Sequence, residues 1–149
     1  MIKSVQHFGI TVSNLDEALH FFCDLLGLEA LPFREASGER AETILGIPGV
    51  SLRLSGVKTP DNNNIELIEY LTQRGERIDL KTCNPGVSHI SFVVDDIQKM
   101  YDDLTAKGVK FINPPYWGGK SIAGMGWGVC FLKGPDGIPI ELMQAPKDK

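Results

Sequence analysis

The chain contains an internal repeat, which limits the fold to two copies of one unit. Residues 5–15 (VQHFGITVSNL) recur as residues 87–97 (VSHISFVVDDI), so that His7 and His89 occupy equivalent positions. A second pair of segments, 61–68 and 136–143, aligns Glu66 with Glu141. The 149 residues therefore indicate one domain built from two similar halves.

Each half is expected to begin with a strand that leads into a helix. Both repeated segments alternate apolar with small or polar residues, then reach an Asn or Asp, and then place apolar residues three and four positions apart. The apolar positions are Leu15, Ala18, Leu19, Phe22 and Leu26 in the first half, and Ile97, Met100, Tyr101 and Leu104 in the second. Asn14 followed by Glu17 resembles a capping box, and Gly27 and Gly108 stand where a left-handed residue would end each helix.

Three further strands are expected in each half. They cover residues 28–33, 50–57 and 61–68 in the first half, and 109–112, 128–132 and 136–143 in the second. The pattern predicts an α+β fold of two βαβββ modules. Within a single domain of residues 1–149, we place module 1 at 1–71, a charged linker at 72–85, and module 2 at 86–149.

Composition excludes several classes of protein. The net charge is −4, with 15 basic and 19 acidic residues and no basic cluster, so we expect no nucleic-acid partner. The longest uncharged stretches, 4–15 and 121–132, are well short of the roughly 20 residues that a membrane-spanning helix needs. Residues 1–5 lack the pattern of a secretory signal, and three widely spaced cysteines favour reduced thiols, so we expect a cytoplasmic protein. A chain of this length can form a hydrophobic core without a metal ion, so we expect any bound metal to take part in the reaction rather than to hold the fold together.

Strand alternation separates four potential metal ligands from their apolar neighbours. His7 and His89 fall on the opposite strand face from the residues that should pack under the helices, and Glu66 and Glu141 alternate with Ile and Leu. A single strand histidine is more often a packed residue than a ligand, and a strand glutamate is usually solvated. The coincidence of both types at equivalent repeat positions favours one shared site for Zn²⁺, Ni²⁺, Co²⁺, Mn²⁺ or Fe²⁺.

These residues carry a resemblance to a known superfamily. The segments Gln6–Ile10, 65–67, 89–96 and 134–142 resemble those of the vicinal oxygen chelate superfamily, which includes glyoxalase I, methylmalonyl-CoA epimerase, bleomycin-resistance proteins and extradiol dioxygenases. The resemblance implies two βαβββ modules that form a curved mixed sheet around a metal cavity. It also implies a homodimer, and metal ligands at His7, Glu66, His89 and Glu141.

Within that superfamily, four protein ligands fit metal-assisted proton transfer. The resemblance makes Glu141 the candidate base, acting on a small oxygenated metabolite in isomerisation, epimerisation or lyase chemistry. Glyoxalase I carries an Arg where this chain has Thr11, and epimerases carry a second base where it has Ile47. We therefore expect Thr11 to contact a substrate other than the glutathione hemithioacetal or methylmalonyl-CoA.

Two other functions stay open from the sequence. A ring-cleaving dioxygenase would hold iron with two His and one carboxylate and would use a further histidine, for which only His20 remains, on the polar side of the first helix. A protein that binds a drug or ligand without turnover is the second alternative. Metal analysis followed by turnover tests would separate these functions.

A segment rich in glycine and aromatic residues, 114–128, could cover the substrate. Trp117 and Trp127 would then form a wall of the pocket, and Lys120 would meet an anionic group. The alternative is a surface loop that leads into a strand.

Overall fold

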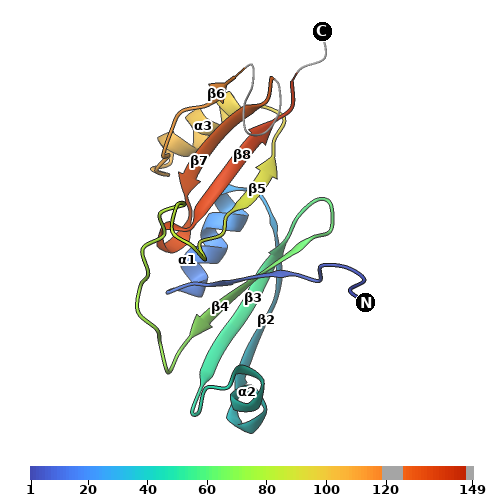
Figure 1. Cartoon of the computed structure of the whole chain (residues 1–149), viewed down its shortest axis with the longest axis vertical. Helices are drawn as coiled ribbons and strands as arrows, with labels where there is room; N and C mark the ends of the chain where they lie inside the picture. The colour runs from blue at the N-terminus through green and yellow to red at the C-terminus, as the bar shows by residue number, and fades with distance from the viewer. Residues whose placement is uncertain (119–125, 147–149) are drawn as a thin grey trace. The chain divides into compact units, whose positions relative to one another are not determined.

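A computed structural model describes residues 1–118 and 126–146 (Figure 1). The chain divides into two compact units, Met1–Arg77 and Ile78–Lys149. Unit 1 contains β1 (Phe8–Thr11), α1 (Leu15–Leu19), the π-helical turn η1 (His20–Leu25), β2 (Glu29–Ser37), α2 (Gly38–Leu45), β3 (Ser51–Lys58) and β4 (Asn64–Tyr70). Unit 2 contains β5 (Ile90–Val93), α3 (Ile97–Ala106), β6 (Tyr116–Trp117), β7 (Gly128–Lys133), the 3₁₀ turn η2 (Pro135–Gly137) and β8 (Pro139–Gln144).

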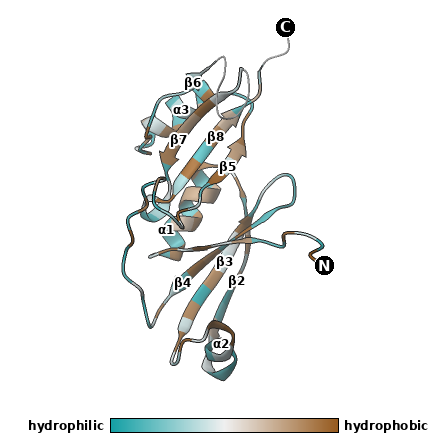
Figure 2. Ribbon diagram, viewed as in Figure 1, coloured by the Kyte–Doolittle hydropathy of each residue, from teal (hydrophilic) through white to brown (hydrophobic). Residues whose placement is uncertain are grey.

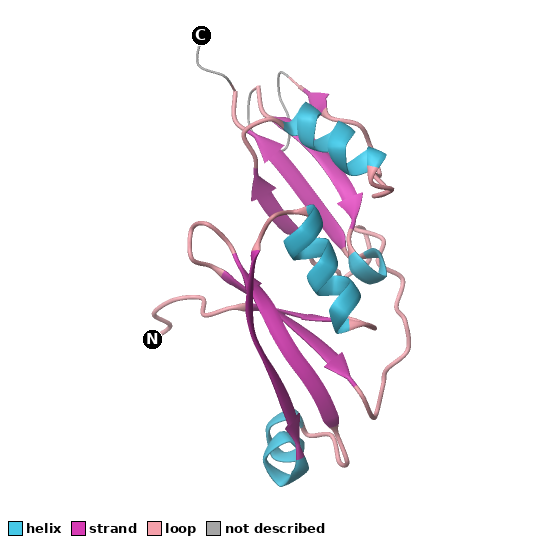
Figure 3. Cartoon of the chain, turned by 180° about the vertical axis from the view of Figure 1, so that it is seen from behind, coloured by secondary structure: helices cyan, strands magenta, loops and turns pink. Residues whose placement is uncertain are grey.

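The two units have the same sheet topology. Each holds a four-stranded mixed sheet, in the order β1-β4-β3-β2 and β5-β8-β7-β6, and neither sheet closes on itself. The first and last strands of each unit pair in parallel, and the other pairs are antiparallel. In unit 1, α1 packs on β3 and β4, and in unit 2, α3 packs on β7 and β8 (Figure 3). This arrangement confirms the predicted α+β class and the repeat.

Local capping fixes where the helices begin and end. The Asn14 side chain accepts the backbone N–H groups of Asp16 and Glu17, and Asp96 does the same for Lys99 at the start of α3. Gly27 and Gly108 have φ of +77° and +87°, the left-handed conformation predicted for them. None of the helices in the described part of the chain is long and apolar enough to cross a membrane.

The core of each unit lies between its sheet and its helix. The fully buried side chains come from the helices and from the two central strands of each sheet. Hydrophobic residues predominate along β3 and β8, with hydrophilic residues between them (Figure 2). The fully buried side chains include Leu15, Phe22, Val57, Ile65 and Leu67 in unit 1, and Ile97, Leu104, Leu132, Ile140 and Leu142 in unit 2.

The helix α2 and residues 109–112 differ from the expectation. The sequence pattern did not predict α2, which buries Ala41 against Val50 and Leu52 and ends at the left-handed Gly46. Residues 109–112 form only a bridge between Phe111 and Leu132 instead of a strand, and the fourth strand of the sheet is the short β6.

Candidate functional site

Unit 1 brings His7 and Glu66 together, as the alternation predicted for this half. His7 directly precedes β1. Gly9, two residues further along and on the same strand face as His7, pairs with Glu66 of β4. Paired residues share a sheet face, so the imidazole and the carboxylate point to the same side. His7 Nε2 lies 3.5 Å from Glu66 Oε2, and 21% of the Glu66 side chain is exposed.

The other ring nitrogen of His7 is engaged by its neighbour. Nδ1 lies at hydrogen-bond distance from the side-chain oxygen of Gln6. A contact at Nδ1 fixes the orientation of the imidazole ring, whose Nε2 faces Glu66. Histidine ligands of metal sites are oriented by such a bond from the second ring nitrogen.

Arg34 also reaches Glu66, a contact that the sequence analysis missed. Its Nη2 donates to Glu66 Oε1 at 2.9 Å, and 64% of the Arg34 side chain is exposed. The predicted strand 28–33 stopped one residue short of Arg34, whereas β2 continues to Ser37. No periodicity in the sequence could find Arg34, because its position depends on an irregularity of β2.

Unit 2 repeats the pair with His89 and Glu141. His89 Nε2 lies 3.6 Å from Glu141 Oε2, and 15% of the Glu141 side chain is exposed. The edge of the Phe131 ring packs against the imidazole, with ring centroids 5.3 Å apart. Glu141 and Phe131 are cross-strand partners, so the carboxylate lies beside an aromatic surface.

The two pairs have the donor chemistry of a metal site. In each pair a histidine Nε2 faces a carboxylate oxygen, and both atoms are donors to a metal ion when the imidazole is neutral. Donors about 2.1 Å from a common ion lie about 3.0–3.4 Å apart, close to the two observed separations. Within either unit, the described residues hold no group of three or more His, Cys, Asp and Glu side chains that could bind a metal ion. Each unit by itself thus offers two such donors.

The substrate-contact residues expected from the sequence lie in different surroundings. Thr11 is exposed and pairs with Ile68, so it shares a sheet face with Glu66. Trp117 pairs with Gly128, three positions along β7 from the partner of Glu141, and therefore lies on the opposite face from Glu141. Trp127 is partly buried directly before β7, and Lys120 lies outside the described residues.

Gly128 leaves room for the indole ring of Trp117. A Cβ atom at Gly128 would lie 2.8 Å from two atoms of that ring, too close for any other residue without a shift. Trp117 therefore packs across β7 on the face that also carries α3. The residue of β6 that shares the face of Glu141 is Tyr116, which pairs with Val129.

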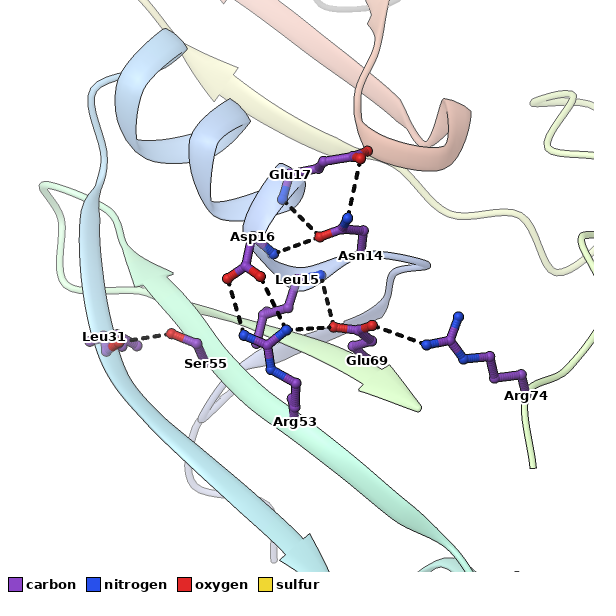
Figure 4. A network of polar contacts seen from close by, with 9 residues as sticks. All are labelled: Asn14, Leu15, Asp16, Glu17, Leu31, Arg53, Ser55, Glu69 and Arg74. Atoms are coloured by element: carbon purple, nitrogen blue, oxygen red, sulfur yellow. Dashed lines mark hydrogen bonds and ion pairs between the residues drawn. The ribbon is translucent and has the colours of Figure 1, made fainter. Parts of the chain in front are cut away.

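A polar network around the buried Glu69 lies on the helix-bearing face of unit 1 (Figure 4). Glu69 Oε2 accepts the backbone N–H of Leu15, the first residue of α1, at 3.2 Å. Arg53 Nη1 donates to the same oxygen at 3.2 Å, and Arg74 Nη2 donates to Oε1 at 3.2 Å. Arg53 also forms a two-point contact with Asp16. The network fixes the start of α1 on the sheet.

Unit 2 uses a neutral residue at the equivalent place. Gln144 is related to Glu69 by the same sequence offset that relates Glu141 to Glu66. Its Oε1 accepts the backbone N–H of Ile97, the first residue of α3, at 2.8 Å. The repeat offset was the signal that could have found both residues.

Two of the three cysteines, Cys23 and Cys130, are poor candidates for a nucleophile. Burial, with a smaller contribution from the charge of Glu141, raises the pKa of Cys130 to about 12. Burial also raises the pKa of Cys23, with a smaller effect from Asp24. Neither thiol is therefore ionised near neutral pH.

Comparisons with known proteins agree with the fold. The family model for the Glyoxalase/Bleomycin resistance protein/Dioxygenase superfamily matches residues 4–142. A probable lactoylglutathione lyase from Synechocystis sp. is 32% identical over 145 residues, covering 96% of both chains. A 2-epi-5-epi-valiolone epimerase from Actinomyces sp. is 26% identical, covering 96% of this chain and 80% of the relative. A glyoxalase family protein from Bacillus cereus superposes with a TM-score of 0.85 at 25% identity, covering 98% and 96% of the two chains.

Proposed function

Because the chain belongs to the Glyoxalase/Bleomycin resistance protein/Dioxygenase superfamily, we propose that it is a metal-dependent, glyoxalase-like enzyme. It transfers a proton next to a carbonyl or carboxylate of a small oxygenated metabolite, giving isomerisation, epimerisation or lyase chemistry. The observation that carries this proposal is the duplicated His–Glu pair, with separations of 3.5 and 3.6 Å at equivalent repeat positions. The names of a lyase and an epimerase among the relatives support the same class.

In this proposal the two pairs together bind one divalent ion. His7, Glu66, His89 and Glu141 are the ligands, and neutral imidazoles with carboxylates suit Zn²⁺, Ni²⁺, Co²⁺, Mn²⁺ or Fe²⁺. When bound, the ion supplies Lewis-acid stabilisation of the negative charge that develops on a substrate oxygen. Two carboxylates and two imidazoles leave positions for the neighbouring oxygens of a chelating substrate.

Glu141 is the proposed base. Among the described residues, no side chain donates a hydrogen bond to the Glu141 carboxylate, and His89 Nε2 lies 3.6 Å from its Oε2. A carboxylate that is not held elsewhere can accept a proton from a C–H group placed beside it. Thr11, on the face of Glu66, contacts the substrate in this proposal, and Trp127 and Lys120 are further candidates for substrate contact.

The substrate differs from those of the two best-known reactions in the family. Thr11 lacks the positive charge that would hold the glutathione moiety, and Ile47 cannot act as a second base. We expect poor activity with the glutathione hemithioacetal and with methylmalonyl-CoA. The proposal includes a cytoplasmic homodimer, and the three free cysteines fit a reducing compartment.

Hydrogen exchange tests the reaction class. Candidate α-hydroxy-carbonyl and 2-keto compounds are incubated with metal-loaded protein in D₂O, and C–H exchange is followed by NMR. We expect enzyme-dependent exchange that Glu141→Gln lowers by about 10²-fold or more, because general-base catalysis contributes at least that factor. Glu76→Gln is the control, since Glu76 is exposed and lies outside the strands that carry Glu66 and Glu141.

Two other outcomes would replace this proposal. Oxygen consumption with catechols by the iron-loaded protein, together with no exchange in any candidate compound, would replace this proposal by ring-cleaving dioxygenase activity. Metal binding without turnover of either kind would favour a ligand-binding protein.

Metal removal tests whether the ion is catalytic or structural. Each unit has its own apolar core, so the chelator-treated protein should keep its circular dichroism spectrum. Adding back divalent ions should raise the melting temperature, because they bind only the folded state. Unfolding after chelation would contradict a purely catalytic role.

A further inference from the structure

The two His–Glu pairs differ in what holds the carboxylate. Glu66 has both oxygens engaged, with Oε1 accepting from Arg34 at 2.9 Å and Oε2 facing His7 at 3.5 Å. Among the described residues, no arginine or lysine contacts Glu141. Tyr116 takes the position equivalent to Arg34. Arg34 pairs with Leu54 and Tyr116 pairs with Val129, and the offset that relates Glu66 to Glu141 also relates Leu54 to Val129.

A bulge in β2 directs Arg34 to this face. Leu31 pairs with Gly56 and Arg34 pairs with Leu54, so two residues of β2 lie opposite the single Ser55. The extra residue reverses the alternation, and Leu31 and Arg34 therefore share the face of Glu66. Phe33, within the bulge, instead packs against Arg53, with the guanidinium carbon 5.2 Å from the ring centroid.

We propose that Arg34 is a positioning residue for the metal site, an inference that rests on the proposed function. By occupying Oε1, Arg34 leaves only Oε2 of Glu66 to bind the ion and fixes its direction. Glu66 is then the permanent carboxylate ligand, and Glu141, without such a donor, is the one that can leave the ion. The asymmetry assigns different roles to two carboxylates that the repeat makes equivalent.

Positioning and simple electrostatics predict opposite effects of removing Arg34. A guanidinium repels a cation, so its loss alone would tighten metal binding. At 64% exposure that repulsion is weakened by solvent, whereas the hydrogen bond that orients Glu66 is direct. If Arg34 positions Glu66, its loss weakens metal binding instead.

The experiment measures Zn²⁺ affinity by competition with a chromophoric chelator for the parent protein and three variants. Arg34→Ala should bind about 10- to 100-fold more weakly, the usual effect of removing a group that orients a metal ligand. Arg34→Lys keeps one charged donor and should recover most of the affinity. Arg40→Ala removes the same charge from the exposed surface of α2 and should leave the affinity unchanged.

The Co²⁺ absorption spectrum gives a second readout, because it responds to ligand geometry rather than to stability. We expect it to change in Arg34→Ala and to be restored in Arg34→Lys. Unchanged or tighter Zn²⁺ binding by a folded Arg34→Ala variant would overturn the inference while leaving the proposed function intact. Failure of the parent protein to bind any divalent ion would overturn the proposed function and, with it, the role of Arg34.

Discussion

The two units meet one structural requirement with different chemistry. In each, a side chain of the closing strand accepts the first backbone N–H of the helix, at 3.2 Å from Leu15 to Glu69 and at 2.8 Å from Ile97 to Gln144. Glu69 is charged and contacts two arginines, whereas Gln144 is neutral and needs none. The requirement is therefore for an acceptor at this position, and the charge is an addition that unit 1 compensates locally.

The same contrast extends to the His–Glu pairs. In unit 1 an arginine contacts each of the two strand carboxylates, Glu66 and Glu69. In unit 2 Glu141 lies beside His89 and is the cross-strand partner of Phe131. Both strand carboxylates of unit 1 are thus paired with arginine, whereas among the described residues no lysine or arginine contacts Glu141 or Gln144. Exchanging residues between the units tests this contrast.

The largest effect is expected from Gln144→Glu, which brings the charge of unit 1 into unit 2. Gln144 is 5% exposed, and no cation contacts it among the described residues, so we expect a loss of about 3 kcal/mol in the free energy of unfolding near pH 8. Burial raises the folded-state pKa of the new carboxyl above its unfolded value of about 4.3. The loss should therefore disappear below about pH 4 and grow as the pH rises. Urea unfolding at several pH values measures it, and a loss independent of pH would contradict the explanation.

A smaller effect is expected from the reverse exchange, Glu69→Gln. The amide oxygen still accepts the N–H of Leu15, but Arg53 and Arg74 lose their charged partner. Both guanidinium groups reach solvent, so the expected loss is about 1 kcal/mol. It should shrink in about 1 M salt, which screens the ion pairs in the parent protein. Equal losses for Glu69→Gln and Gln144→Glu would disprove the contrast between the units.

The smallest effect is expected from Asp16→Asn at the edge of the network. The Asp16 side chain is 72% exposed, and exposed ion pairs are strongly screened by water. Arg53 keeps its contact with Glu69, so the change in unfolding free energy should stay below about 0.5 kcal/mol. A loss above about 1 kcal/mol, in the same urea assay, would show that Asp16 rather than Glu69 holds Arg53 in place.

The repeat made much of the fold predictable from the sequence. Strand alternation and helix spacing act over a few residues, and two copies of each pattern removed most of the ambiguity, as in the matching of Glu66 with Glu141. The helix α2 was not predicted because the described residues of unit 2 contain no second copy of it that could have supported the assignment. The π-helical turn at His20–Leu25 was not predicted either. It buries Phe21 beside Phe22, and a 3.6-residue period does not place both side chains in the core.

The candidate site was predictable only in part. His7, Glu66, His89 and Glu141 could be named because each pair obeys the alternation that its own strand imposes. Arg34 could not, because alternation fails at a bulge. Trp117 shows the same limit, since the face on which it lies depends on its pairing with Gly128.

The bulge in β2 also bears on how residue roles are transferred between related proteins. A relative with a regular strand would bring to the carboxylate face the residue aligned with Phe33, while the residue aligned with Arg34 would point toward the helix. Conversely, a relative that lacks one residue of the bulge would keep an arginine in register with Leu54, although an alignment would show a gap beside it. Counting along the sequence is therefore misleading at this strand, and the cross-strand partner on β3 is the reliable reference for locating the cation that holds Glu66.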